Sequence, residues 1–162
     1  MDRAAKAIEQ WKRERPDLDV SPMGVIGRLN EASSLIARDR LAPVFARFGL
    51  QSGEFDVLAT LRRSGAPYAL TPTELYEATM VTSGAMTARL DRLEKGGLIQ
   101  RAPHPSDRRG VVVQLTAKGL ELVDESLAAH VANEHDILAG LTSIERETLA
   151  DLLGKLIGSL SP

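Results

Sequence analysis

The chain contains no cysteine among its 162 residues. This absence excludes disulfide bonds, thiolate metal ligands, cysteine nucleophiles and thiol-based redox sensing. The sequence also has no apolar run of about 18 residues, so we expect no membrane-spanning helix. Its charged, alanine-rich beginning is unlike a signal peptide. We therefore expect a cytoplasmic protein, and its length and 43% apolar content suit one domain with a sizeable core.

Motifs for catalysis are also missing. The sequence has no glycine-rich phosphate loop and no Ser/His/Asp grouping near a strand, turn and helix. It has three histidines, His104, His130 and His135. His130 and Glu134 have a spacing that suits two metal ligands on one helix face, but solvated polar residues commonly share it. The sequence predicts neither an enzyme nor a cofactor, and we assign no metal site.

Charge is distributed unevenly along a chain whose net charge is −2. Residues 89–109 carry six basic and three acidic side chains, whereas residues 121–151 carry eight acidic and one basic. A basic segment on an acidic chain is typical of a DNA-binding protein with a separate assembly region. A solvated charged face would give the same count, so the charge pattern alone leaves both interpretations open.

Capping and breaking residues divide the chain into helices and one hairpin. Ser21 as an N-cap, with Pro22 at the first helical position, predicts a helix start. Thr71 and Thr142 each begin a capping box. The double glycine at 96–97 predicts a helix end. The predicted elements are helices over 2–15, about 22–47 and 53–63, a short helix after Thr71, a helix from Thr82 or Ser83 to Gly96, strands over 98–101 and 111–115, and helices from Thr116 and over 142–160.

The helix that begins at Thr82 or Ser83 has two different faces. Met86, Leu90 and Leu93 form an apolar stripe that is expected to pack inward. Small and short polar residues lie on the opposite face, which suits entry into the major groove of DNA. Arg89 lies at the margin of the inward stripe, so we expect it to face the protein interior. The candidate DNA-binding residues of this helix are Thr82, Ser83, Gly84, Thr87, Ala88 and Arg92. An ordinary amphipathic surface helix would show the same pattern.

The predicted hairpin adds a more specific signal. The loop over 103–110 carries Arg108 and Arg109, and arginine on a narrow loop can enter the minor groove. Asp107 can hold one guanidinium group in a fixed orientation. A helix, a glycine stop, a strand, a basic loop and a second strand together predict a winged helix-turn-helix over about 70–115.

The stretch DRLEKGGLIQRAPHPSDRRGVVVQLTAKG (91–119) resembles the MarR family of winged-helix transcription regulators. The resemblance implies a mostly α fold with a small β-hairpin wing, and a homodimer that binds a palindromic operator. It also implies an N-terminal extra helix and first dimerisation helix (1–48), a DNA-binding domain (49–116) and C-terminal dimerisation helices (117–162). The apolar faces of 22–47 and 142–160 agree with an isologous dimer, although burial within one chain is the alternative.

The extra helix bearing Trp11 resembles the urate-responsive subgroup of that family, as does GEFDVLATLRRSGAPY (53–68). The resemblance implies that Trp11, Asp56, Arg89 and Arg101 form the pocket of a small anionic effector, which releases the DNA. A planar anionic purine can stack on an indole and pair with arginine. Three of these four residues also have an alternative role: Trp11 as a core anchor, Asp56 as a solvated carboxylate and Arg101 as a phosphate contact.

Two further functions compete with a repressor that responds to urate or a related purine. One is a MarR-type regulator of an aromatic carboxylate or another organic acid. The other is an architectural module that keeps the fold without binding DNA, and the wing arginines argue against it.

Overall fold

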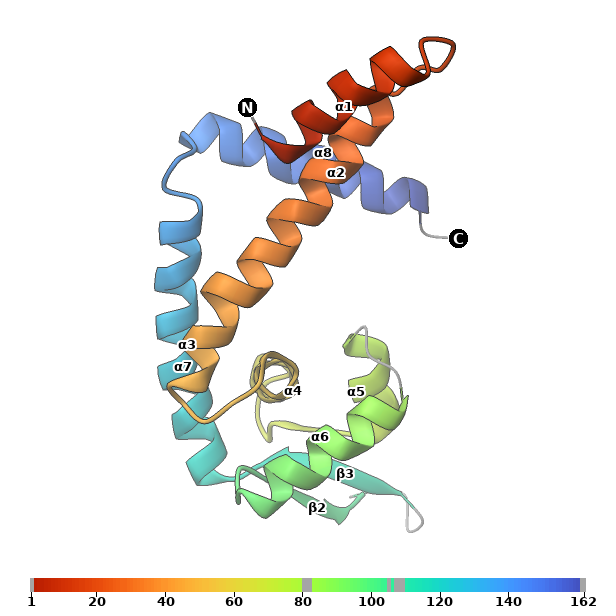
Figure 1. Ribbon diagram of the computed structural model, residues 1–162. Coiled ribbons are helices and arrows are strands. Elements are labelled where there is room, and N and C mark those ends of the chain that lie inside the picture. The colour runs from red at the N-terminus through yellow and green to blue at the C-terminus, as the bar shows by residue number, and fades with distance from the viewer. Residues whose placement is uncertain (1, 80–82, 105, 107–109, 161–162) are drawn as a thin grey trace. The chain divides into compact units, whose positions relative to one another are not determined.

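The computed structural model describes residues 2–79, 83–104, 106 and 110–160. The chain divides into two compact units, Met1–Pro43 and Val44–Pro162, and each is described by itself. The fold is mostly helical with a small antiparallel sheet, as the sequence predicts (Figure 1). In the described part of the chain, none of the helices combines the length and apolarity needed to cross a membrane.

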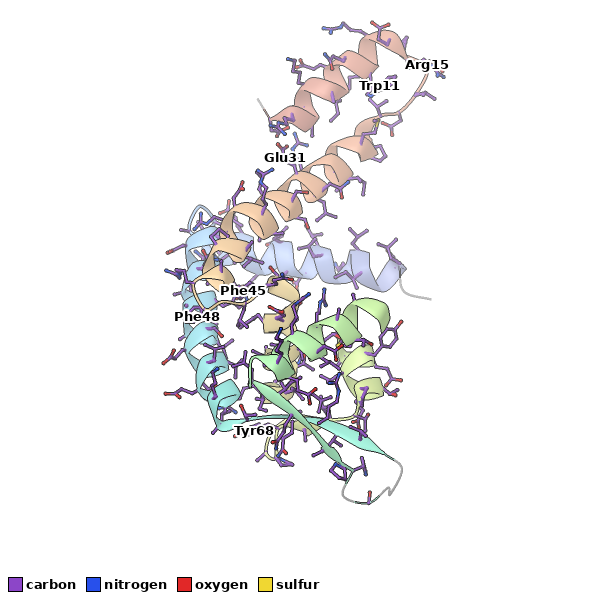
Figure 2. The ribbon with its side chains drawn as sticks, turned by 60° about the horizontal axis from the view of Figure 1, so that its bottom comes forward. Trp11, Arg15, Glu31, Phe45, Phe48 and Tyr68 are labelled. Carbon is purple, nitrogen blue, oxygen red and sulfur yellow. The ribbon has the colours of Figure 1, made fainter. Side chains whose placement is uncertain are left out.

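The first unit is a pair of packed helices, α1 (Arg3–Glu14) and α2 (Ser21–Leu35). Asp2 caps α1 by accepting the Ala5 backbone N–H at 2.7 Å, and its other oxygen pairs with Arg28 of α2 at 2.9 Å. Figure 2 shows Trp11 near the end of α1 that leads into α2, and its side chain is 45% exposed. The predicted helix over 2–15 is therefore confirmed.

The long helix predicted over 22–47 differs in two details. Val20 occupies the N-cap position, so the prediction that Ser21 caps the helix was wrong. Asp19 accepts the Ser21 backbone N–H at 2.9 Å instead. The helix then passes through a π-helical segment, η1 (Ile36–Leu41), before α3 (Ala42–Ala46). Its wider turns place the Ala42 N–H on a carbonyl five residues back, a change that hydrophobic spacing does not reveal.

The second unit contains the predicted winged helix. Its elements are α4 (Ser52–Arg63), β1 (Ala69–Leu70), α5 (Pro72–Ala78), α6 (Ser83–Lys95), β2 (Ile99–Pro103), β3 (Val111–Leu115), α7 (Ala117–Ile137) and α8 (Ser143–Leu160). The capping boxes at Thr71 and Thr142 are both formed. The strand β1 was not predicted; it is two residues long and pairs with β3.

The sheet has the order β1-β3-β2, and all its pairs are antiparallel. Ile99 pairs with Leu115 and Pro103 with Val111, so β2 and β3 form the two sides of the predicted wing. In Figure 1, α6 lies alongside this hairpin. Side chains from several helices and the sheet fill one core, with less than 2% exposure at Val57, Leu58, Leu61, Leu75, Val113 and Val123.

Gly119 provides the close approach between α7 and the start of the wing. A Cβ at this position would overlap the backbone carbonyl of Leu98. The Thr116 hydroxyl caps the same end of α7 by accepting the Gly119 N–H at 3.0 Å. The first turn of α7 is thereby held directly against the residue that precedes β2.

We expect Gly119→Ala to lower the free energy of unfolding by about 2 kcal/mol, the usual cost of overpacking. Helix propensity alone would raise the free energy of unfolding by about 1 kcal/mol, so a decrease can be attributed to the overlap with Leu98. Urea unfolding measures the change in this free energy. The control is Gly154→Ala in α8, where an added Cβ meets no described atom within 4 Å. A urea-unfolding midpoint of Gly119→Ala at or above that of wild type would contradict the close packing of Gly119 against Leu98.

Candidate nucleic-acid interface and adjoining pocket

The recognition helix of the candidate interface is α6, and its two faces separate as predicted. Met86, Leu90 and Leu93 are buried, with exposed fractions of 3%, 4% and 2%. Thr87 and Ala88 lie on the exposed face. Ser83 and Gly84 belong to the first turn of α6. The described part of the helix therefore presents the short side chains of Thr87 and Ala88 outward.

Four of the predicted DNA-binding residues lie outside the described residues. They are Thr82, Asp107, Arg108 and Arg109. The strands that lead to the wing loop are described up to His104 and from Gly110, whose carbonyl accepts the His104 backbone N–H at 2.9 Å. The roles of the wing residues remain predictions.

Arg92 lies against α4. Its Nε donates to Glu54 Oε1 at 2.6 Å, and its Nη2 donates to Gln51 Oε1 at 3.0 Å. Glu54 is buried, and its second oxygen accepts the Gln51 backbone N–H at 2.8 Å. Glu54 was not predicted as a site residue, although its spacing of three from Gln51 is that of a capping box.

Arg101 lies at the side of the wing and pairs with two carboxylates of α6. Its Nη2 donates to Asp91 at 2.6 Å, and its Nη1 donates to Glu94. These bonds raise the pKa of Arg101, the hydrogen bond to Asp91 most strongly. The pairs attach the second half of α6 to β2. Arg101 does not line the pocket that contains Asp56.

Arg89 faces the interior of the second unit, in agreement with its place on the helical wheel. Its guanidinium group packs against Gly53 of α4, where a Cβ would overlap it. Its Nη1 is buried and has no hydrogen-bond partner among the described residues. An unpaired buried donor costs free energy that a hydrogen-bond acceptor would recover. Gly53 was missed in the sequence analysis because a glycine in the first turn of a helix has no distinctive pattern.

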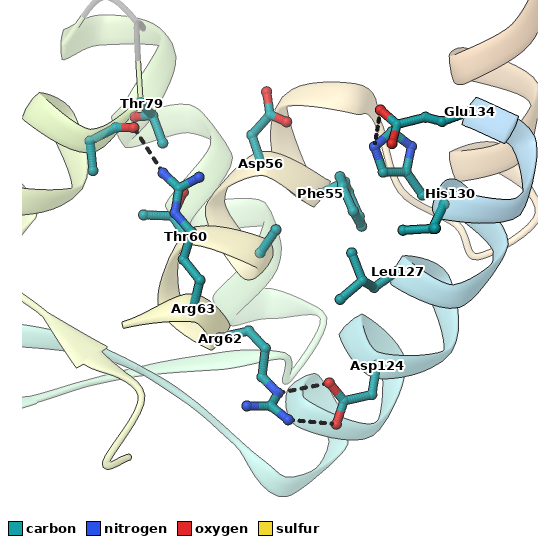
Figure 3. A pocket seen from close by; sticks show the side chains of 13 residues that line it. Phe55, Asp56, Thr60, Arg62, Arg63, Thr79, Asp124, Leu127, His130 and Glu134 are labelled. Atoms are coloured by element: carbon teal, nitrogen blue, oxygen red, sulfur yellow. Dashed lines mark hydrogen bonds and ion pairs between the residues drawn. The ribbon is translucent and has the colours of Figure 1, made fainter. Parts of the chain in front are cut away.

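A pocket of about 720 Å³ lies in the same unit, and neither Arg89 nor Gly53 is among its lining residues. Figure 3 shows it between α4 and α7, with the end of α5 on one side. Its apolar wall includes Phe55 and Leu127. Its charged and titratable lining residues are Asp56, Arg62, Arg63, Asp124, His130 and Glu134.

Hydrogen bonds hold three of these groups, Arg62, Arg63 and Asp124. Arg62 donates to both oxygens of Asp124, at 2.7 and 3.4 Å, and thereby ties α4 to α7 (Figure 3). Arg63 donates to the Ala78 carbonyl at 3.2 Å. These contacts fix the sides of the pocket.

His130 stacks beside two aromatic rings at the pocket wall. Its ring centroid is 5.3 Å from Phe45 and 4.9 Å from Phe55, and its Nε2 lies 3.1 Å from Glu134. No group of three or more potential metal ligands occurs among the described residues. The His130 side chain is 16% exposed, so it is not the solvated polar residue that the sequence also allowed.

Asp56 combines a pocket position with an altered acidity. Desolvation by the surrounding atoms raises its pKa above the ordinary value of 3.8, and the charges of Arg89, His130 and Arg63 partly offset this rise. Asp56 and Arg89 are thus close enough to interact electrostatically. Trp11, the remaining predicted ligand residue, belongs to the first unit. The predicted effector site remains a prediction.

A helix-turn-helix followed by a two-stranded wing defines a winged-helix DNA-binding protein. The MarR family profile matches residues 48–110. The transcriptional regulator PecS of Dickeya dadantii (strain 3937) is 48% identical over 149 residues, which cover 92% of this chain and 89% of PecS. The multiple antibiotic resistance protein MarR of Salmonella typhimurium is 32% identical, with 86% and 93% covered.

The solved structures agree with these relatives. A mutant MarR from E. coli in complex with operator DNA superimposes with a TM-score of 0.72 at 28% identity, covering 90% of this chain and 96% of MarR. The chain belongs to the MarR family of winged-helix transcription regulators.

The raised pKa of Asp56 gives a pH-dependent prediction. A raised pKa in the folded state means that the folded protein binds the proton more tightly than the unfolded chain. The stability that this adds is present below pH 3.8 and is lost as the pH rises through the folded pKa. We therefore expect Asp56→Asn to raise the free energy of unfolding at pH 7, and this gain to vanish near pH 3.

Urea unfolding at a series of pH values measures the effect. Glu145→Gln is the control, and its effect on stability should have the opposite sign, because the hydrogen bond from the Thr142 backbone N–H lowers the pKa of Glu145. That variant should lose stability at pH 7 and match wild type at low pH. An Asp56→Asn variant less stable than wild type at pH 7 would disagree with the environment described here.

Proposed function

We propose that this chain is a homodimeric repressor that binds a palindromic operator and releases it when a small anionic effector binds. The observation that carries the DNA-binding part is α6, with its short outward side chains, next to the β2–β3 wing. The MarR relative solved with operator DNA supports it. In this proposal Thr82, Ser83, Gly84, Thr87 and Ala88 face the major groove, while Asp107, Arg108 and Arg109 form the wing tip. Such a regulator acts in the cytoplasm, where bacterial DNA lies.

Exposed apolar side chains support the homodimer. No residue of α8 is buried within the chain, and Ile144, Leu152, Ile157 and Leu160 are 57–76% exposed. Val25 and Ile26 of α2 are 65% and 49% exposed. Two chains related by a twofold axis would bury such faces and place two wings on the two halves of a palindrome.

The effector site is proposed around Asp56 and Arg89. The unpartnered Nη1 of Arg89 requires an acceptor, and a carboxylate or a planar urate-like anion supplies one. The same anion would repel an ionised Asp56. Its binding would therefore act on α4 through Asp56 and on α6 through Arg89. Urate or a related purine is the first candidate. Of the residues that the resemblance implies as ligands, Asp56 lines the pocket, whereas Arg101 is paired with Asp91 and Glu94. An aromatic carboxylate is the second candidate, favoured by the apolar wall at Phe55 and Leu127.

DNA binding is tested with Arg109→Ala. Because an arginine that contacts base edges typically contributes about 1–3 kcal/mol, we expect operator affinity to fall at least about fivefold. Fluorescence anisotropy with a palindrome selected by the wild-type protein measures this, and titration should give two chains per palindrome. Arg13→Ala on α1 removes the same charge outside the winged helix. Equal affinities for Arg109→Ala and Arg13→Ala would support an architectural role, and no preference for the palindrome over random duplex would refute the proposed function.

The effector is tested by thermal unfolding with urate, xanthine and salicylate. At about 100 times its dissociation constant, a ligand specific for the folded state raises the free energy of unfolding by about 2.7 kcal/mol. We expect one of these anions to raise the midpoint of wild type and of Arg13→Ala, and to lose this effect in Arg89→Ala. A shift that survives Arg89→Ala unchanged would rule out the assigned site.

A further inference from the structure

Two arginines one turn apart on α6 meet two consecutive residues of α4. Arg89 packs on Gly53, and Arg92 bonds to Glu54. The two contacts differ in charge balance. Arg89 leaves Nη1 without a partner among the described residues, whereas Arg92 is paired with a carboxylate.

The environment of Glu54 makes the Arg92 contact important. The Glu54 side chain is 8% exposed, whereas that of Arg92 is 49% exposed. A carboxylate taken out of water needs both a counter-charge and hydrogen bonds to its oxygens. Arg92 supplies the charge to one oxygen, and the Gln51 backbone N–H binds the other. If Arg92 turned toward DNA, Glu54 would remain buried without its counter-charge.

We propose that Arg92 is a positioning residue that fixes the recognition helix on α4 through Glu54, and that it does not neutralise a DNA phosphate. This inference rests on the proposed operator binding. It replaces the assignment of Arg92 to DNA that the charge count favours. Two of the three guanidinium nitrogens of Arg92 donate hydrogen bonds, one to Glu54 and one to Gln51. Because the guanidinium group is planar and rigid, this pair of bonds fixes both the distance and the orientation of α6 relative to α4.

The two roles predict opposite effects of Glu54→Gln. If Arg92 contacts a phosphate, removing the competing carboxylate frees it and removes a negative charge, so DNA affinity rises. If Arg92 positions α6, the glutamine amide cannot accept hydrogen bonds at both of its terminal atoms, so operator affinity falls. We expect a loss of about tenfold, which corresponds to one charge-assisted hydrogen bond.

Arg92→Met supplies an independent readout. A lost phosphate contact reduces the slope of log affinity against log salt by about 0.9 per protomer. A lost positioning contact leaves that slope unchanged. It lowers the affinity for the selected palindrome about tenfold and has little effect on the affinity for random duplex. The double variant Glu54→Gln/Arg92→Met should lose no more than either single variant, because both remove one interaction.

The experiment measures anisotropy at four salt concentrations with the palindrome selected by wild type and with random duplex. Glu77→Gln, an exposed carboxylate on α5, calibrates the loss of one negative charge. Thermal unfolding sets a temperature at which every variant is folded. The proposal is overturned if Glu54→Gln binds the palindrome as tightly as wild type or tighter, or if Arg92→Met reduces the salt slope by about 0.9 per protomer. Failure of wild type to prefer any palindrome would instead refute the proposed function.

Discussion

The contact between the first turn of α4 and the second half of α6 is the constraint on which the candidate interface depends. Gly53 lets the Arg89 guanidinium lie against the helix, and Glu54 receives Arg92. Glu54 also lies in the first turn of α4, where the helix dipole favours a negative charge. One turn of backbone therefore determines how closely α6 approaches and how it is oriented.

Arg92 and Arg89 differ in whether their hydrogen bonds are satisfied, and this difference decides which of them an effector can act on. The Arg92–Glu54 pair is satisfied, and the Arg101 pairs with Asp91 and Glu94 attach the same half of α6 to β2. Arg89 alone among these three leaves a buried nitrogen without a described partner. An anion in the proposed pocket would therefore act on Arg89 while the other contacts keep α6 and the wing together. The helix and its wing would then move as one body.

Local rules explain which parts of the fold the sequence predicted correctly. The stripe of Met86, Leu90 and Leu93 follows helical periodicity, and the capping boxes at Thr71 and Thr142 depend on residues three apart. The elements that were missed depend on distant partners. The strand β1 is too short for a period-two pattern and exists because β3 offers its edge. The Ser21 cap failed because Asp19, two residues earlier, takes the N–H that defines the helix start.

The charged residues show why the site was harder to predict than the fold. A count over 89–109 treats every arginine as available to DNA, but Arg92 pairs with a residue 38 positions away, and Arg101 pairs across the helix–wing junction. No local spacing predicts either pairing. Arg92 and Arg101 are each held by carboxylates of the same chain, although their side chains are 49% and 34% exposed. A charge count along the sequence therefore overestimates how much positive charge this segment has free for a phosphate backbone.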